Sequence, residues 1–395
     1  MSDSERLVIW AVVKEIDNTT MMNSKLENSY TTKGNKIAHH SAVIDAIRKE
    51  GRFIPVTVQL APTEACESDC PFCSVRHRTV DQYIEINQIE RCIRDFASLG
   101  CKALQITGGG NPLLYYDRKS KSDINSIIRI AVEHHLQVGI ITNSHDLSRI
   151  ESSVHPFINW IRISLIKLDE GKSPQDYNFN SFPQHKISLS YIYYNEGEGH
   201  QRKRFYKGST DESLGKIFEL AEMYPNVKFI RIAPDATPGC SVRESIIENP
   251  FIKGALSKYK NLFVQGINID TLTDPFNRGC YVGALRPFVA SSPNPFEGAL
   301  VYDCHCHTHF SGWMYNKDFS LCHVDEIIPT WNRMAENFIK SKFPYEVRGN
   351  GGVNWMKTCH VCYHSNNNSL IYQIINEDQD YSKLSEEAID DENFI

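Results

Sequence analysis

The chain has no long apolar segment. None of its apolar runs approaches the 18 residues that a membrane-spanning helix needs. The first residues, Met1 to Arg6 (MSDSER), also lack the basic start and apolar centre of a secretory signal peptide. We therefore expect a soluble, cytoplasmic protein without a membrane partner.

A strong charge of either sign is missing as well. The 42 basic and 48 acidic residues leave a formal net charge of -6, which gives no general reason to expect a polyanionic partner. One local exception is the stretch from His200 to Lys207 (HQRKRFYK), where basic and aromatic residues are mixed. Such a stretch can contact phosphates and stack on bases, but it is usually a solvated loop. A nucleic-acid partner therefore stays an alternative.

Cysteine, in contrast, is plentiful. The chain has 12 cysteines, and cytosolic thiols stay reduced, so metal ligands are expected rather than disulfides. Cys66, Cys70 and Cys73 follow a C-x3-C-x2-C spacing (CESDCPFC). Three thiolates can hold three irons of a [4Fe-4S] cluster and leave the fourth iron open for a substrate or cofactor. The alternative is a zinc knot or scattered buried thiols, although zinc usually takes four ligands in two pairs.

This triplet, with the aromatic Phe72 directly before the last cysteine, resembles the fingerprint of the radical S-adenosylmethionine (radical SAM) superfamily. A second motif, Gly108-Gly109-Gly110-Asn111, resembles the glycine-rich motif that holds the amino group of SAM in that superfamily. The usual motif ends Gly-Glu-Pro, whereas this chain has Asn111 in place of the acid. An amide oxygen accepts a hydrogen bond from an ammonium group but adds no charge, so a weaker contact is expected.

The order of apolar runs predicts an α/β protein. Strand-like and helix-like segments alternate from Phe53 onward, and the resemblance, which extends to about Asn366, implies a partial (β/α)6 TIM-like barrel with its chemistry at the carboxyl ends of the strands. We expect an N-terminal extension (1–52), the barrel (53–269), a small Cys-rich domain (270–370) and an acidic, flexible tail (371–395). Strands are predicted at 55–60, 103–107, 137–142, 160–166, 187–193 and 227–232, and helices at 42–47, 86–99, 124–135, 147–154 and 214–223.

Polar residues at the ends of the third and fourth predicted strands are further candidates. The resemblance implies that Asn143, Ser144, Arg162 and Ser164 touch the ribose and carboxylate of SAM, although Asn143 and Ser144 suit ordinary strand-end capping equally well. A cation inside an apolar strand needs an anionic partner, which favours the role of Arg162. The same argument applies to Arg231, with a substrate carboxylate or phosphate as the partner.

The C-terminal third contains a second group of cysteines. Four thiolates would ligate every iron of another [4Fe-4S] cluster, and the spacing resembles the shortened SPASM extension called a twitch domain. Cysteines and histidines at this spacing suit a structural zinc site equally well, so both alternatives stay open. The best fit uses Cys280, Cys304, Cys359 and Cys362, with Cys306 as a rival for Cys304 and Cys322 left over.

The resemblance implies a radical enzyme. A reduced cluster would cleave SAM to methionine and a 5'-deoxyadenosyl radical, which abstracts hydrogen from a small polar or nucleotide-linked substrate, such as a modified nucleobase. The auxiliary cluster would accept an electron or anchor the substrate, and flavodoxin or ferredoxin would supply the reductant. The net outcome, as oxidoreductase, isomerase or transferase, is open. Two alternatives remain: a peptide or protein maturase, and a non-catalytic iron-sulfur or zinc module, which Asn111 supports.

Overall fold

The structure is a computed structural model of the whole chain. Several predicted features lie outside the residues that it describes: the basic stretch around Arg202 to Lys207, and Cys306, Cys359 and Cys362. The described residues are 30, 36–75, 78–195, 208–235, 246, 248–265, 280–292, 294, 297–305, 320–344, 364–386 and 389–395.

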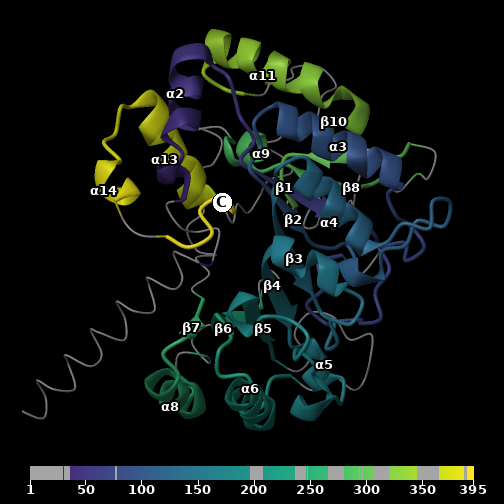
Figure 1. Cartoon of the computed structure of the whole chain (residues 1–395). Helices are drawn as coiled ribbons and strands as arrows, with labels where there is room; N and C mark the ends of the chain where they lie inside the picture. Colours follow the sequence, from purple (N-terminus) through teal and green to yellow (C-terminus); the bar gives the residue numbers. More distant parts are fainter. Residues whose placement is uncertain are drawn as a thin grey trace, which may run out of the picture.

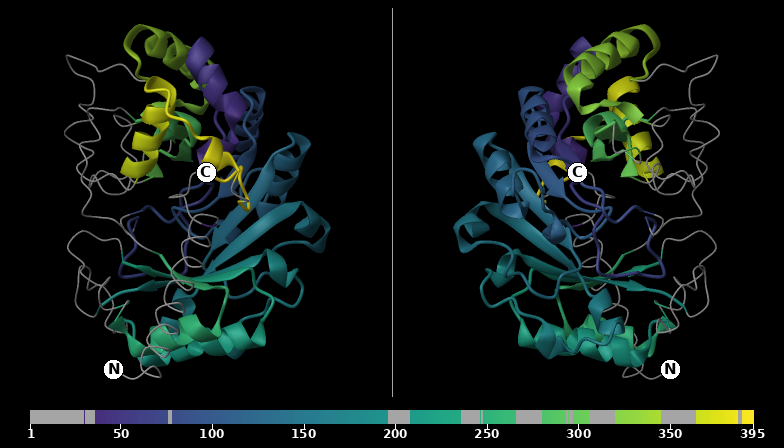
Figure 2. Two further views of the ribbon diagram at one scale, coloured as in Figure 1. Left: turned by 90° about the vertical axis from the view of Figure 1, so that its left-hand side faces the viewer. Right: turned by 90° about the vertical axis from the view of Figure 1, so that its right-hand side faces the viewer.

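One ten-stranded sheet organises the described part of the molecule, in the order β10-β9-β8-β1-β2-β3-β4-β5-β6-β7. Neighbouring strands are parallel from β8 through β1 to β7, and β9 and β10 continue antiparallel. The sheet is curved but not closed, because β7 and β10 end the order (Figure 2). The strands are β1 (Thr57–Ala61), β2 (Ala103–Ile106), β3 (Gln137–Thr142), β4 (Ile158–Ser164), β5 (Ile187–Tyr193), β6 (Phe229–Pro234), β7 (Leu262–Val264), β8 (Phe288–Ser291), β9 (Ala299–Tyr302) and β10 (Ser320–His323).

Amphipathic helices connect and cover these strands. Helix α3 (Ile86–Ser98) buries Ile89, Ile93 and Phe96, which recur at helical spacing on one face. Helix α2 lies beside α11 and α13, which come from the other end of the chain (Figure 1). The other α-helices are α2 (Ser41–Glu50), α4 (Ile124–Glu133), α5 (Ile166–Asp169), α6 (Asp211–Met223), α8 (Pro250–Lys258), α9 (Val282–Leu285), α11 (Ile327–Ser341), α13 (Ser365–Asn376) and α14 (Ser382–Ser385). No helix in the described ranges is long and apolar enough to cross a membrane.

The predicted α/β class and partial barrel are confirmed, and the six predicted strands coincide with β1 to β6 within a few residues. The helix predicted at 147–154 is wrong. This region instead contains a 3-10 helix, η3 (Ser152–Phe157), with Pro156 inside it. Proline has no N–H to donate and disfavours an α-helical residue before it, so a regular helix is not favoured there.

The region after residue 270 continues the barrel sheet, although the sequence suggested a separate small domain. Strand β8 pairs in parallel with β1, at the register Leu60 to Val289. Helix α11 packs against α3, and the indole of Trp331 meets the ring of Phe96 at 5.1 Å. Periodicity did not predict this arrangement, because each strand of this region has only four residues.

The last residues, 389–395, also differ from the expected flexible tail. They lie at the amino-terminal ends of the barrel strands, where Thr57 Oγ1 donates to the Asn393 carbonyl at 2.6 Å and Asn393 donates to Gln137 Oε1 at 3.1 Å. Phe394 is 5% exposed and packs against Trp160 at a ring distance of 5.0 Å. The acidic composition indicated a solvated, flexible tail. In the folded chain, however, the Asp391 carboxylate forms a salt bridge with Lys228 at 2.7 Å.

Replacing Phe394 by Ala is expected to lower the free energy of unfolding by about 3 kcal/mol, because it leaves a cavity beside Trp160. Denaturant unfolding of the two proteins measures this. Phe157→Ala is the matched control, since that ring is 47% exposed and its loss should cost far less. Equal effects of the two substitutions would mean that the last residues do not form part of the core.

Candidate cofactor and cluster site

The three predicted cluster ligands lie on one loop after β1. Cys66, Cys70 and Cys73 are all partly exposed. Burial raises the pKa of the Cys70 thiol, and the nearby charges of Cys73 and Cys66 raise it further. The Cys73 N–H donates to the Cys70 carbonyl at 3.0 Å, so one turn carries two of the three thiols, and a shared iron-sulfur cluster requires ligands that lie on such a compact loop. The loop therefore fits the predicted three-thiolate site.

Arg78 holds this loop in shape. Its guanidinium donates to the Cys73 sulfur at 3.3 Å and to the carbonyls of Glu64 and Ser68 at 3.1 and 3.2 Å. Burial raises the pKa of the Cys73 thiol, whereas the Arg78 charge opposes that rise. A cation bonded to the loop therefore favours the thiolate, which is the form that binds iron.

The glycine-rich segment packs directly against the Cys loop. The N–H of Gly110 donates to the Thr63 carbonyl at 2.9 Å, and the N–H of Asn111 donates to the Ala65 carbonyl at 2.7 Å. A Cβ atom at Gly110 would lie 2.0 Å from the carbonyl oxygen of Ala65. Glycine is needed at this position because the two backbone segments approach so closely.

Asn111 lies at the centre of a buried polar network. Its amide oxygen accepts from the Thr142 hydroxyl at 2.7 Å, and its amide nitrogen donates to Ser144 Oγ at 2.8 Å. The same nitrogen donates to both carboxylate oxygens of Glu67, at 3.1 and 3.2 Å. A carboxylate thus lies beside the position where the family motif has its acid, although it comes from the Cys loop.

Asn143 connects the third strand to the Cys loop. Its amide nitrogen donates to Ser68 Oγ at 2.9 Å and lies 3.6 Å from the Cys66 sulfur. Its amide oxygen is buried and has no hydrogen-bond partner among the described residues. A buried acceptor of this kind needs a donor, so the geometry fits a ligand hydroxyl or amino group beside the cysteines.

Two other predicted cofactor residues face different parts of the barrel. Ser164 lies opposite Ser190 in the register of β4 and β5. Arg162 donates to the Tyr30 carbonyl at 2.8 Å and lies over the rings of Trp160 and Phe229, each 5.5 Å away. Trp160 contacts the tail residues, so these contacts of Arg162 belong to the opposite end of the barrel from the Cys loop.

Arg231 lies inside the barrel on β6. It donates to Ser190 Oγ at 2.8 and 3.0 Å and to Gln265 Oε1 at 2.8 Å. These partners are neutral, and no carboxylate of the described residues forms an ion pair with it. Burial lowers the pKa of Arg231 to about 10. The interior therefore contains a half-buried cation that an anionic group would stabilise.

The aromatic residue of the fingerprint, Phe72, packs on Tyr194 with a ring distance of 5.4 Å and an angle of 60°. The Tyr194 hydroxyl donates to Asp169 at 3.2 Å, as does that of Tyr191 at 3.0 Å. Burial raises the pKa of Asp169, which indicates a carboxyl group held in a largely apolar layer. The Cys loop is therefore supported from β5 and α5 as well as from β1.

Of the predicted auxiliary ligands, Cys280 and Cys304 lie within the described residues. Cys304 follows β9, and its sulfur lies close to ring nitrogens of His305 and His364, with all three ligand atoms within 4.8 Å of one another. Cys322, the leftover cysteine, is buried on β10, where burial raises its pKa to about 12. Cys322 is therefore a packing residue in this structure.

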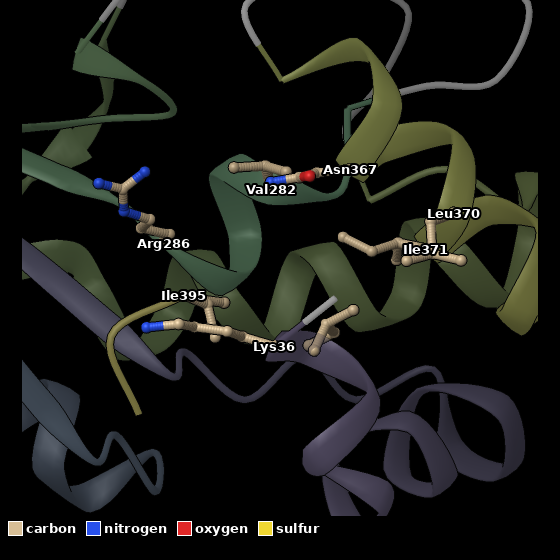
Figure 3. A pocket seen from close by; sticks show the side chains of 8 residues that line it. Lys36, Val282, Arg286, Asn367, Leu370, Ile371 and Ile395 are labelled. Carbon is tan, nitrogen blue, oxygen red and sulfur yellow. The ribbon is translucent and has the colours of Figure 1, made fainter. Parts of the chain in front are cut away.

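A separate cavity lies between α9, α13 and the last residue (Figure 3). Lys36 and Arg286 line one side of it, and Leu370 and Ile371 line another. None of the predicted cluster or cofactor residues lines it. The cavity therefore does not belong to the site around the Cys loop.

Sequence reasoning missed two residues of the site, Glu67 and Arg78. Both lie in or just after the cysteine triplet, so the sequence shows that they are near the site. It does not show their hydrogen bonds, because these form only when the loop folds against Asn111 and Arg78 reaches the loop carbonyls.

The match to a family model agrees with this location. Residues 60–170 match the family model described as "Radical SAM superfamily". No curated protein sequence matches the chain significantly. SuiB of Streptococcus suis bound to S-adenosylmethionine is similar at 14% identity and a TM-score of 0.48, over 83% of this chain and 78% of SuiB. anSMEcpe with bound AdoMet is similar at 10% identity and a TM-score of 0.42, over 82% of this chain and 97% of anSMEcpe. BtrN in complex with AdoMet and 2-DOIA is similar at 12% identity and a TM-score of 0.33, over 72% of this chain and 86% of BtrN.

Proposed function

Residues 60–170 match the radical SAM superfamily model, and we propose that this chain is a radical SAM enzyme that abstracts hydrogen from a small polar substrate that carries an anionic group. Enzymes of this superfamily use a [4Fe-4S] cluster and SAM. Held by Cys66, Cys70 and Cys73 and reduced, such a cluster with SAM would supply a 5'-deoxyadenosyl radical that could remove a hydrogen atom from the substrate. The observation that carries the proposal is the packing of the Cys66–Cys73 loop, through Asn143 and Glu67, against the Asn111 network.

In this proposal each part of the site has one task. The three thiolates hold the cluster, and Arg78 keeps their loop in place through its bonds to Cys73 and to loop carbonyls. Glu67, held in position by the Asn111 amide nitrogen, binds the ammonium group of SAM, and the buried oxygen of Asn143 accepts a hydrogen bond from the cofactor. A charged acceptor strengthens such a contact roughly twofold over a neutral one.

The substrate part of the proposal rests on Arg231. Its guanidinium lies inside the barrel and donates to a hydroxyl and to an amide oxygen. A guanidinium has five N–H groups, so it can also donate to a carboxylate or phosphate. Ser164 and Ser190 lie at the same level of the sheet and add hydroxyl groups for polar contacts. This lining favours a small anionic metabolite or nucleotide-linked molecule.

The non-catalytic alternative rested on the missing acid at Asn111. Glu67 weakens that support, because its carboxylate lies within hydrogen-bond distance of Asn111. We expect the reduced, iron-loaded protein to convert SAM to equal amounts of methionine and 5'-deoxyadenosine, measured by chromatography under anaerobic conditions. Intact clusters without either product would refute the proposed activity.

The substrate class has its own test. Candidate carboxylates and phosphates are added with SAM, and the matching neutral alcohols or amides serve as controls. We expect 5'-deoxyadenosine formation to rise with anionic molecules only. A rise with peptides and none with small anions would instead favour a peptide or protein maturase.

A further inference from the structure

Three metal-binding side chains meet at the end of β9. The Cys304 sulfur and ring nitrogens of His305 and His364 all lie within 4.8 Å of one another. The two imidazole rings are 5.7 Å apart and inclined by 76°, so they do not stack. His364 is 5% exposed. Two segments far apart in the sequence therefore place one thiol and two imidazoles around one point.

The surrounding elements fix these side chains in place. Strand β9 pairs with both β8 and β10, and Phe288 of β8 contacts the His305 ring at 6.4 Å. His364 directly precedes α13, where its carbonyl accepts from the Asn368 N–H at 2.8 Å. Regular secondary structure therefore adjoins the ligands on one side each, β9 before Cys304 and α13 after His364.

Asn368 also ties a third segment to this place. Its side-chain oxygen accepts from the N–H groups of Tyr281 and Val282 at 2.8 and 3.0 Å. Cys280 directly precedes Tyr281, so it lies close to the first turn of α13. Cys280 is nevertheless not one of the three residues whose ligand atoms meet.

The chemistry of this group differs from that of the predicted auxiliary cluster. A [4Fe-4S] cluster is usually held by four cysteine thiolates, whereas two of the three groups that converge within the described residues are imidazoles. Zinc binds mixtures of cysteine sulfur and histidine nitrogen readily. We propose that Cys304, His305 and His364 supply three of the four ligands of a zinc ion that joins the end of β9 to the start of α13, with water or a further side chain in the fourth position.

This zinc site goes beyond the proposed function, because zinc has no redox chemistry. It would link the C-terminal helix α13 to the barrel sheet and would not accept an electron from the substrate. Its loss should therefore lower stability and leave the cluster in the barrel in place.

The test is metal analysis of the full-length protein produced with both iron and zinc supplied. We expect about one zinc per chain, lost in Cys304→Ala and in His364→Ala. His323→Ala is the control, because His323 lies on the neighbouring strand β10 and is not one of the three ligands. The barrel iron, which all three variants should retain, reports that each variant is folded.

Cobalt substitution of the intact protein supplies a second readout that needs no variant. We expect the absorption of tetrahedral cobalt together with a sulfur-to-cobalt charge-transfer band. Two results would overturn the proposal. One is intact protein that binds neither zinc nor cobalt, and the other is an iron content that falls by about four in Cys304→Ala but not in His364→Ala, which indicates an all-thiolate cluster.

Discussion

Replacing Glu67 by Gln is expected to weaken SAM binding about 10- to 100-fold, because a hydrogen bond to a charged group contributes about 1.5–3 kcal/mol. Gln keeps the size of the side chain and its contact with Asn111 but removes the negative charge. Anaerobic calorimetric titration of the iron-loaded protein with SAM measures the affinity. Glu85→Gln is the control, because that carboxylate pairs with Lys119 in an exposed position.

A double variant makes this prediction specific. Asn111→Glu alone places two carboxylates side by side and should also weaken binding, whereas Asn111→Glu combined with Glu67→Gln restores a single carboxylate in the network and should recover most of the affinity. An unchanged affinity in Glu67→Gln would show that the ammonium group of SAM binds elsewhere. Iron content, measured in parallel, should stay the same in all three variants.

Replacing Arg231 by Met is the second substitution with a large expected effect. It removes a half-buried cation whose described partners are neutral, so we expect the protein to become more stable by about 1 kcal/mol, because the cost of partly desolvating the charge disappears. SAM cleavage without substrate should continue, but stimulation by anionic molecules should be lost.

Thermal unfolding with and without inorganic phosphate measures this effect. Phosphate should raise the melting temperature of the intact protein and leave that of Arg231→Met unchanged. Arg129→Met is the control, since Arg129 is exposed and pairs with Glu151. A phosphate response that survives in Arg231→Met would place the anion site on other residues.

The sequence alone predicted the parts of the site that are local in the chain. The spacing of Cys66, Cys70 and Cys73 is contained in eight residues, and the glycines at 108–110 follow a strand directly. Six strands were also predicted, because parallel strands buried on both faces read as continuous apolar runs.

The rest depends on contacts between distant segments. No spacing rule relates Glu67 to Asn111, or His305 to His364, because those pairs form only when separate loops fold together. The tail illustrates the same limit. Its acidic residues indicated disorder, yet Asp391 meets Lys228 and Phe394 meets Trp160 in the folded chain.

The central claim is that the Cys loop holds a [4Fe-4S] cluster with an open iron. Anaerobic iron analysis with electron paramagnetic resonance, on the intact protein and on a Cys66/Cys70/Cys73→Ala variant, tests it most directly. We predict a loss of about four irons in the variant, and a change of the spectrum on adding SAM in the intact protein only. Equal iron contents, or a spectrum that SAM leaves unchanged in the intact protein, would contradict the account.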